Sequence, residues 1–462
     1  MSDTIARVAL DPAGLGETDQ LVYNWLRERF GCEPRNFCRQ LRWRTSWEAD
    51  VEIDGVPQGI LVRGSRGETT HYPLTLHQEA QVHMVMERHG VLAPKVYGMI
   101  EEPLAIVMER LSGTINSELI SDPIARHKVR REFIEELAKL HAVPIEEFGE
   151  IGLSLPASGR DIALGLYRPC IDIARAAFRD RPFPLTEFFA RWLERNVPET
   201  RTNAALVTAD AGQFLYDGDR MTGLIDFEVA YIGDPAAEFA GMRLRDTTEP
   251  LGDLSELRDY YEKLTGVDIP TSAIAYHSAG FAGINGMLMW PMIYAPEPQH
   301  DIVAYLQFSV ATGRWSLQGI AESIGHTLDP APEPEANSTI PFETAPAQMA
   351  NMLRAWDTQD EALRYHLDTA TVLAGYLERC GIYGASILQA DLADAEELTG
   401  QKVTTRLEAD TAVDRFVKAA GPESDARLVT FFYRWLSRQS FLLEGCGSQS
   451  YLTDTRLQTF RD

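Results

Sequence analysis

The stretch Val207-Thr-Ala-Asp-Ala-Gly-Gln-Phe-Leu215, followed by Gly223-Leu-Ile-Asp-Phe-Glu228 and Gly233-Asp-Pro-Ala236, is the most informative part of the chain. It places two aspartates, Asp210 and Asp226, sixteen residues apart, each where an apolar run of β-strand character ends. Turn residues separate the two runs, so a hairpin would bring both carboxylates to one edge. The sequence therefore predicts an acidic site at the mouth of a short β-hairpin.

The composition favours an acidic protein with packed cores. The 462 residues suggest two to four domains, 45% of them are apolar, and 43 basic against 68 acidic residues leave a net charge of −25. This charge argues against a nucleic-acid partner, because such binding begins with attraction to phosphates. The apolar stretch 278–295 contains several glycines and Pro291, so it predicts a buried helix and no membrane partner. Five scattered cysteines and a start without an apolar signal segment lead us to expect a cytoplasmic protein.

Periodicity divides the chain into segments of different character. They are a leading helix at 1–30, a β-rich part at 31–112, a mainly helical part at 113–327, a proline-rich linker at 328–344 and an all-helical part at 345–462. Alternation over 42–53 predicts a strand, and Asp54-Gly55 predicts the turn of a hairpin. The predicted fold class is therefore α+β.

The segment Gly223-Leu-Ile-Asp-Phe-Glu-Val-Ala-Tyr-Ile-Gly-Asp-Pro-Ala-Ala-Glu-Phe-Ala240 resembles a pattern of the aminoglycoside-phosphotransferase-like (choline kinase-like) family of small-molecule kinases. The resemblance spans roughly residues 37–325. It implies a bilobal protein-kinase-like fold, with a β-rich N-lobe over 31–112 and a mainly helical C-lobe over 113–327. The chain would be a divergent member with an extra C-terminal helical domain at 345–462.

In that family the aspartate of Asp-Phe-Glu binds Mg²⁺, which the resemblance implies for Asp226. Upstream, the family carries His-Gly-Asp, four more residues and then Asn, whereas this chain has Thr208-Ala-Asp210, with Leu215 at the asparagine position. Leucine cannot ligate a cation. A catalytic loop shortened by two residues would instead move Gln213 into that place as a metal ligand. Asp210 is implied as the catalytic base.

The resemblance also implies a nucleotide site in the N-lobe. Arg63, at the end of Gly59-Ile-Leu-Val-Arg63, would neutralise the α- and β-phosphates, with Glu79 as its helix partner. Leu104-Ala-Ile-Val-Met-Glu-Arg-Leu-Ser-Gly113 resembles the hinge that holds adenine through backbone groups around Glu109 to Leu111.

The hairpin expected to cover the phosphates departs from the family, since Leu41-Arg-Trp-Arg-Thr-Ser-Trp47 contains no glycine. Thr45 and Ser46 could still donate hydrogen bonds to phosphate. Equally, Trp43 and Trp47 could fill the cleft and exclude ATP.

These features imply an ATP-dependent phosphotransferase that acts on a hydroxyl group of a small molecule, such as a hydroxy acid or a hydroxyacyl thioester, with ATP and Mg²⁺ as cofactors. The alternative is a pseudokinase-like protein that binds a nucleotide or metabolite with little or no phosphotransfer; Thr208 and the missing asparagine favour it. The region 345–462 could form a lid, the interface of a homodimer or a partner-binding domain.

Overall fold

The computed structural model describes residues 7–40, 44–65, 73–298, 300–338 and 344–461. Contacts group the chain into two compact units, one made of Met1–Ile162 with Thr200–Ile269 and the other of Ala163–Glu199 with Pro270–Asp462. The chain leaves the first unit within α5 (Gly159–Leu164) and returns to it at Thr200. This grouping by contacts does not coincide with the segments expected from periodicity, whose boundaries stay a prediction.

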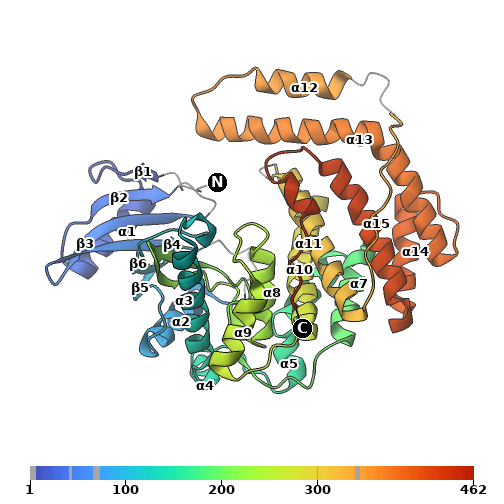
Figure 1. The fold of residues 1–462 in the computed structure, drawn as a ribbon. Coiled ribbons are helices and arrows are strands. Elements are labelled where there is room, and N and C mark those ends of the chain that lie inside the picture. Colours follow the sequence, from blue (N-terminus) through green and yellow to red (C-terminus); the bar gives the residue numbers. More distant parts are fainter. Residues whose placement is uncertain (1–6, 41–43, 66–72, 299, 339–343, 462) are drawn as a thin grey trace. The chain divides into compact units, whose positions relative to one another are not determined.

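A six-stranded antiparallel sheet begins the first unit, in the order β1-β2-β3-β4-β6-β5 (Figure 1). Its strands are β1 (Arg7–Ala9), β2 (Arg35–Gln40), β3 (Ser46–Ile53), β4 (Val56–Gly64), β5 (Val96–Glu101) and β6 (Leu104–Glu109). The strand expected over 42–53 thus begins only at Ser46, because Arg44 and Thr45 belong to the connection from β2; residues 41–43 lie outside the described part. Strand β1 adds an edge that alternation alone did not predict.

Helices α1 (Glu17–Phe30) and α2 (Leu76–Arg88) pack on opposite faces of this sheet (Figure 1). The α1 face buries alternate residues of β3 and β4, including Trp47 and Val62. The α2 face buries Ile106 and Met108 of β6 against Ala80. Because successive strand residues point to opposite faces, Ala105 and Val107 of the same strand pack on the α1 side.

Local sequence explains where these elements turn and end. Asp54 and Gly55 have φ angles of 52° and 79°, as a two-residue hairpin turn between β3 and β4 requires. Thr75 caps α2 in a capping box with Gln78, and Gly90 with a φ of 69° follows the end of the helix.

The remainder of the first unit combines helices with two short antiparallel β-pairs, β7 with β10 and β8 with β9. Its elements are η1 (Ser117–Leu119), α3 (Pro123–His141), α4 (Ile145–Glu150), β7 (Ala205–Val207), β8 (Phe214–Asp217), β9 (Arg220–Leu224), β10 (Tyr231–Gly233), α8 (Ala236–Arg245) and α9 (Leu254–Thr265). The hairpin predicted between the two aspartates is β8–β9.

In the second unit, the regular elements of the described residues are all helices. Its elements are α6 (Tyr167–Ala177), α7 (Pro184–Arg195), α10 (Thr271–Tyr294), α11 (Ile302–Ile324), α12 (Thr344–Arg354), α13 (Glu361–Thr399), α14 (Arg406–Ala419), η2 (Pro422–Ser424), α15 (Asp425–Leu443) and η3 (Ser450–Asp454). Helix α10 packs along α11, and α12 along α13 (Figure 1). None of the described helices combines the length and apolar character needed to cross a lipid bilayer.

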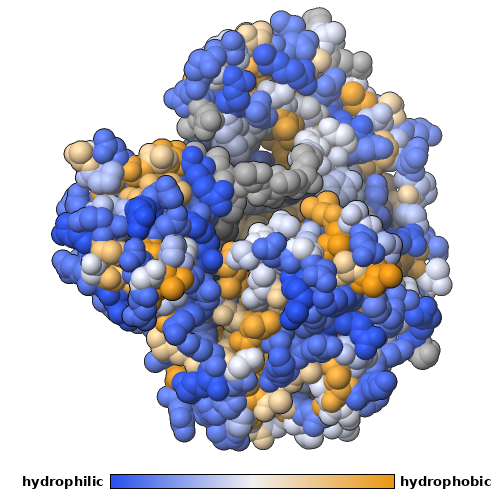
Figure 2. Space-filling view, turned by 60° about the vertical axis from the view of Figure 1, so that its left-hand side comes forward, coloured by the Kyte–Doolittle hydropathy of each residue, from blue (hydrophilic) through white to orange (hydrophobic). Residues whose placement is uncertain are grey.

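The structure confirms the predicted α+β class, with a β-rich N-terminal sheet and a helical remainder that includes a C-terminal helical region. Hydrophilic residues predominate on the face shown in Figure 2, and apolar residues form scattered patches there. Such a surface agrees with the net charge of −25.

Candidate active site

A tight loop carries Asp210 from β7 to β8. Ala209 and Gly212 both have positive φ angles, 60° and 94°, and the N–H of Asp210 donates to the carbonyl oxygen of Thr208 over 2.8 Å. Positive φ is uncommon for a residue with a side chain, so Ala209 holds the loop in a conformation that its surroundings must enforce.

The Asp210 carboxylate has two partners on one oxygen. Arg245 Nη2 lies 2.6 Å from Oδ2, and Gln213 Nε2 donates to the same oxygen over 2.9 Å. About a third of the Asp210 side chain (33%) remains exposed. Desolvation by the surrounding protein raises the pKa of Asp210 above its ordinary value, while the charge of Arg245 acts in the opposite direction.

Asp226 follows β9 and adopts a φ of 64°. The N–H of Ile225 donates to the carbonyl oxygen of Gln213 over 3.1 Å, which ties the two ends of the β8–β9 hairpin together. Asp226 Oδ1 accepts a hydrogen bond from Arg63 Nη2 at 2.6 Å. The Asp226 charge also contributes to raising the pKa of Asp210, so the hairpin brings the two predicted carboxylates within electrostatic reach.

Arg63 of β4 lies at the centre of a cluster of acidic side chains. Its Nη1 atom pairs with Glu79 of α2, which is buried, and its Nη2 atom also lies 3.1 Å from Glu228 Oε2. Arg44, in the β2–β3 connection, pairs with the same Glu228 oxygen. The structure therefore joins the predicted Arg63 and Glu79 and adds Arg44 and Glu228.

Helix α2 contacts the Asp-Phe-Glu segment through a second pair. The fully buried Phe227 packs edge-on against His83, with ring centroids 5.1 Å apart and an interplanar angle of 77°. Burial, together with the nearby charge of Arg63, lowers the pKa of His83 to about 3, so this histidine is neutral. Both contacts fix α2 relative to Asp226.

One face of helix α8 packs against the Asp210 loop. Buried Glu238 accepts hydrogen bonds from the N–H and the hydroxyl of Thr208, each over 2.6 Å. A Cβ on Gly241 would lie 1.9 Å from the carbonyl oxygen of Ala209, so only glycine permits this approach. His141 Nε2 lies 3.3 Å from Glu238 and joins the same network.

Sequence reasoning did not assign Glu238, Gly241 or Arg245 to this loop. These residues follow one another at spacings of three and four positions in the helix after Pro235, which places them on one helical face. This spacing could have predicted them from the sequence. Asp234, which precedes α8 by two residues, accepts the N–H of Ala236 over 3.0 Å.

The predicted hinge residues lie at the end of β6, an inner strand of the sheet, and directly after it. The N–H of Glu109 donates to the carbonyl oxygen of Lys95 over 2.8 Å, whereas no hydrogen bond of the described residues uses the backbone of Leu111. The Leu111 side chain reaches Gly223, where a Cβ would meet its Cδ1 at 2.6 Å.

The β2–β3 connection presents its residues differently from the expectation. The Thr45 carbonyl oxygen accepts the N–H of Gly64 over 3.0 Å, and the buried Ser46 hydroxyl donates to the Arg44 carbonyl oxygen over 3.4 Å. Trp47 belongs to the α1 core, where its Nε1 donates to Asp19 Oδ1 over 2.7 Å, so it does not fill the cleft. Trp43 lies outside the described residues.

The donor set around Asp226 suits Mg²⁺. Among the described residues, no group of three or more His, Cys, Asp or Glu side chains is arranged to hold a metal ion. Mg²⁺, however, is commonly held by one or two carboxylates together with substrate phosphates. Gln213 turns its amide nitrogen to Asp210, and its amide oxygen has no hydrogen-bond partner in the described residues. Asp226 and Gln213 would therefore supply oxygen ligands.

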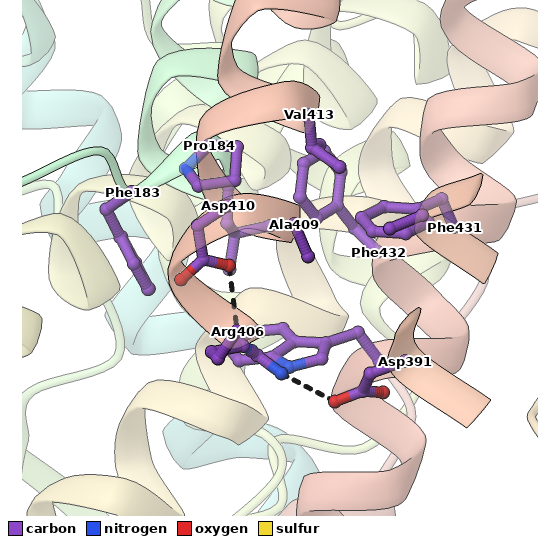
Figure 3. A pocket seen from close by; sticks show the side chains of 12 residues that line it. Phe183, Pro184, Asp391, Arg406, Ala409, Asp410, Val413, Phe431 and Phe432 are labelled. Carbon is purple, nitrogen blue, oxygen red and sulfur yellow. Dashed lines mark hydrogen bonds and ion pairs between the residues drawn. The ribbon is translucent and has the colours of Figure 1, made fainter. Parts of the chain in front are cut away.

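A separate hollow in the second unit contains none of the predicted site residues (Figure 3). Aromatic and aliphatic side chains line it, and Arg406 crosses one side, 2.6 Å from Asp391 and 3.2 Å from Asp410. Its polar groups are thus already paired with one another.

Known proteins resemble this chain in part of its sequence and in its fold. Residues 51–271 match the model of the family described as "Phosphotransferase enzyme family" (APH). No curated protein matches the chain. A structure from Ralstonia eutropha JMP134, named as an aminoglycoside phosphotransferase, is similar at 14% identity and a TM-score of 0.50, over 67% of this chain and 98% of that one.

The macrolide 2′-phosphotransferase MphH of Brachybacterium faecium is 17% identical, with a TM-score of 0.43, over 63% of this chain and 97% of that one. At such identities, the likeness to the Ralstonia structure establishes the fold alone. Together with the family match, it confirms the resemblance stated from the sequence. Residues 51–271 therefore resemble the phosphotransferase family whose model they match, and the fold is that of its solved relatives.

Proposed function

We propose that this protein is an ATP- and Mg²⁺-dependent phosphotransferase whose acceptor is a hydroxyl group of a small molecule. The observation that carries the proposal is the position of Arg63, which pairs with Glu79 of α2 and also contacts Asp226. A cation held by a helix carboxylate beside a metal-binding aspartate is the arrangement that phosphoryl transfer uses to position nucleotide phosphates. The family match supports phosphotransfer as the class of activity.

In this proposal, each group has a separate task. Mg²⁺ would neutralise charge on the phosphates, and Asp226 and Gln213 would hold it. Arg63 would bind phosphate oxygens, since positioning and charge neutralisation supply most of the catalysis in phosphoryl transfer. Asp210 would orient the acceptor hydroxyl and take its proton, and Arg245 would hold the Asp210 carboxylate in place.

The acceptor class rests on the sequence. Arginine and aromatic side chains in 160–195 and 245–325 suit a hydroxy acid, a hydroxyacyl thioester or a similar alcohol better than a polycationic sugar. We propose such an organic hydroxy compound as the acceptor.

A nucleotide-binding experiment tests the proposal. Mg-ATP should stabilise the wild-type protein in a thermal-shift assay, and Asp226→Asn should lose most of this stabilisation because a metal ligand is removed. Asp219→Asn is a matched control: this carboxylate lies in the turn of the same hairpin, is 59% exposed and pairs only with Lys128 among the described side chains. Wild-type protein that does not bind Mg-ATP would refute the proposal.

A second candidate is a nucleotide-binding protein with little or no phosphotransfer. It is favoured by the direct ion pairs that connect Asp210 with Arg245 and Asp226 with Arg63, since both carboxylates are already neutralised by protein cations. The two functions differ in turnover. Mg-ATP binding without ADP release on any alcohol of a broad panel would favour this candidate.

A further inference from the structure

One face of the N-terminal sheet carries Arg63 at one end and an unassigned cluster of charges at the other. Along β4, Arg63, Leu61 and Gly59 share this face, because Val62 and Ile60 are buried against α1. Their cross-strand neighbours on β3 are Ser46, Glu48 and Asp50. Glu48 and Asp50 therefore lie on the same face as Arg63.

Arg110, the residue between the two hinge positions, covers Gly59 on this face. A Cβ on Gly59 would lie 2.9 Å from Nε and Nη2 of Arg110 and 3.1 Å from its Cζ, so glycine makes room for the guanidinium group. The Arg110 N–H also donates to the Gly59 carbonyl oxygen over 2.9 Å. The planar group thus lies over the sheet, where a larger residue would displace it.

Two carboxylates hold the edge of this guanidinium group. Arg110 Nη1 lies 3.2 Å from Glu48 Oε2, and Nη2 lies 2.5 Å from Asp50 Oδ1. Both carboxylates are anchored on their other oxygen, Glu48 by Gln40 over 2.6 Å and Asp50 by Asn36 over 2.6 Å. The Arg110 side chain nevertheless keeps 34% of its surface exposed.

The distance between the two ends of this face suits a nucleotide. Gly59 and Arg63 are four residues apart on one strand, which corresponds to roughly 13 Å at about 3.3 Å per residue. A nucleoside polyphosphate can place its phosphates at one end of such a span and its base at the other. A hollow lined by Asn36, Asp50, Gln58 and Gly59 adjoins the Arg110 end.

We propose that Arg110 is the platform on which the base of the nucleotide stacks, and that Glu48 and Asp50 fix its guanidinium group for this purpose. The inference rests on the proposed function, which supplies the nucleotide and its phosphate end. A guanidinium group is planar, always charged and well suited to stacking on an aromatic ring. Recognition of the base would then depend on a charged side chain, in a face otherwise lined by Leu61 and Met108.

The test compares ligands with and without a base. The affinities of Mg-ATP and of inorganic tripolyphosphate are measured by calorimetry for wild type, Arg110→Ala and Arg110→Lys. We expect Arg110→Ala to weaken ATP about tenfold or more, as loss of a stacking partner does, with little change for tripolyphosphate. Arg110→Lys keeps a cation for Glu48 and Asp50 but lacks the plane, so it should also weaken ATP selectively.

Arg88→Ala provides the control, because Arg88 forms an exposed ion pair with Glu147 at the end of α2. Thermal melting of each variant checks that the protein is folded. Unchanged or tighter ATP binding in Arg110→Ala would overturn the platform, as would equal losses for both ligands or full affinity in Arg110→Lys. If wild type binds neither ligand, the proposed function itself fails, which separates the two ideas.

Discussion

Asp210 is subject to two opposing influences that together determine when it can accept a proton. Desolvation favours the neutral carboxyl group and raises its pKa, and the nearby charges of Asp226 and Glu238 act in the same direction. Arg245, 2.6 Å away, favours the carboxylate and lowers the pKa. A base needs a pKa that is raised but still leaves it ionised at the working pH.

Removing the cation tests this balance. In Arg245→Ala the Asp210 carboxylate loses its cationic partner and keeps only Gln213, so its pKa should rise further. Because the base works only when it is ionised, activity is lost as the pH falls through this pKa. The acid limb of the kcat/KM profile should therefore move to higher pH.

The profile is measured for wild type, Arg245→Ala and the surface control Arg88→Ala, after melting curves show that each variant is folded. An acid limb at the same pH in wild type and Arg245→Ala would mean that a group other than Asp210 titrates there.

At the scale of elements, α8 acts as a support for the Asp210 loop. Glu238 binds the start of the loop through Thr208, and Arg245 binds Asp210 itself. Gly241, between them, lets the loop backbone approach the helix. The positive φ of Ala209 is thus imposed by three contacts from a single helix face.

A methyl group at position 241 should disturb the contact between α8 and the Asp210 loop. Gly241→Ala would place a Cβ 1.9 Å from the Ala209 carbonyl oxygen, so either the helix or the loop must move. We expect a loss of about 1–3 kcal/mol in the free energy of unfolding and a marked loss of turnover. Gly384→Ala, in α13 with open space around it, should instead stabilise by about 0.5–1 kcal/mol. Urea unfolding and turnover of both variants are compared; equal effects would contradict the role of α8.

The same contacts explain what could be predicted from sequence and what could not. The Asp54-Gly55 turn and helix α2 follow from local patterns, because turn chemistry and capping act over a few residues. The pairing of Arg63 with Glu79 was expected only from the family resemblance. Arg245 reaches Asp210 only because the chain folds back through β8, β9 and β10. The spacing of residues in the sequence alone could not predict that the chain brings Arg245 back to Asp210. The ion pairs of Arg110 likewise depend on the register between β3 and β4.

At the scale of the whole molecule, each of the two units contains buried ion pairs of its own. The first contains the candidate site, and the second contains a buried ionic network among helices α13, α14 and α15. Asp391 is buried and lies 2.6 Å from both Arg406 and Arg438. Arg438 also lies 2.5 Å from Asp394. Buried charges of this kind are costly to separate, since either partner alone is left without compensation in a low-dielectric interior.

Asp391→Ala should therefore destabilise the second unit and leave nucleotide binding intact. Without Asp391, Arg406 keeps only Asp410 and Arg438 keeps only Asp394, and we expect a loss of about 1–3 kcal/mol in the free energy of unfolding of that unit. Glu444→Ala serves as the matched control, because Glu444 is 66% exposed in its pair with Arg379, and its removal should cost about 0–1 kcal/mol. Calorimetric melting of the full chain should show the transition of the second unit shifted down in Asp391→Ala alone. The Mg-ATP affinity, measured below that transition, should equal that of wild type. A parallel loss of Mg-ATP affinity would show instead that nucleotide binding depends on the ionic network of the second unit.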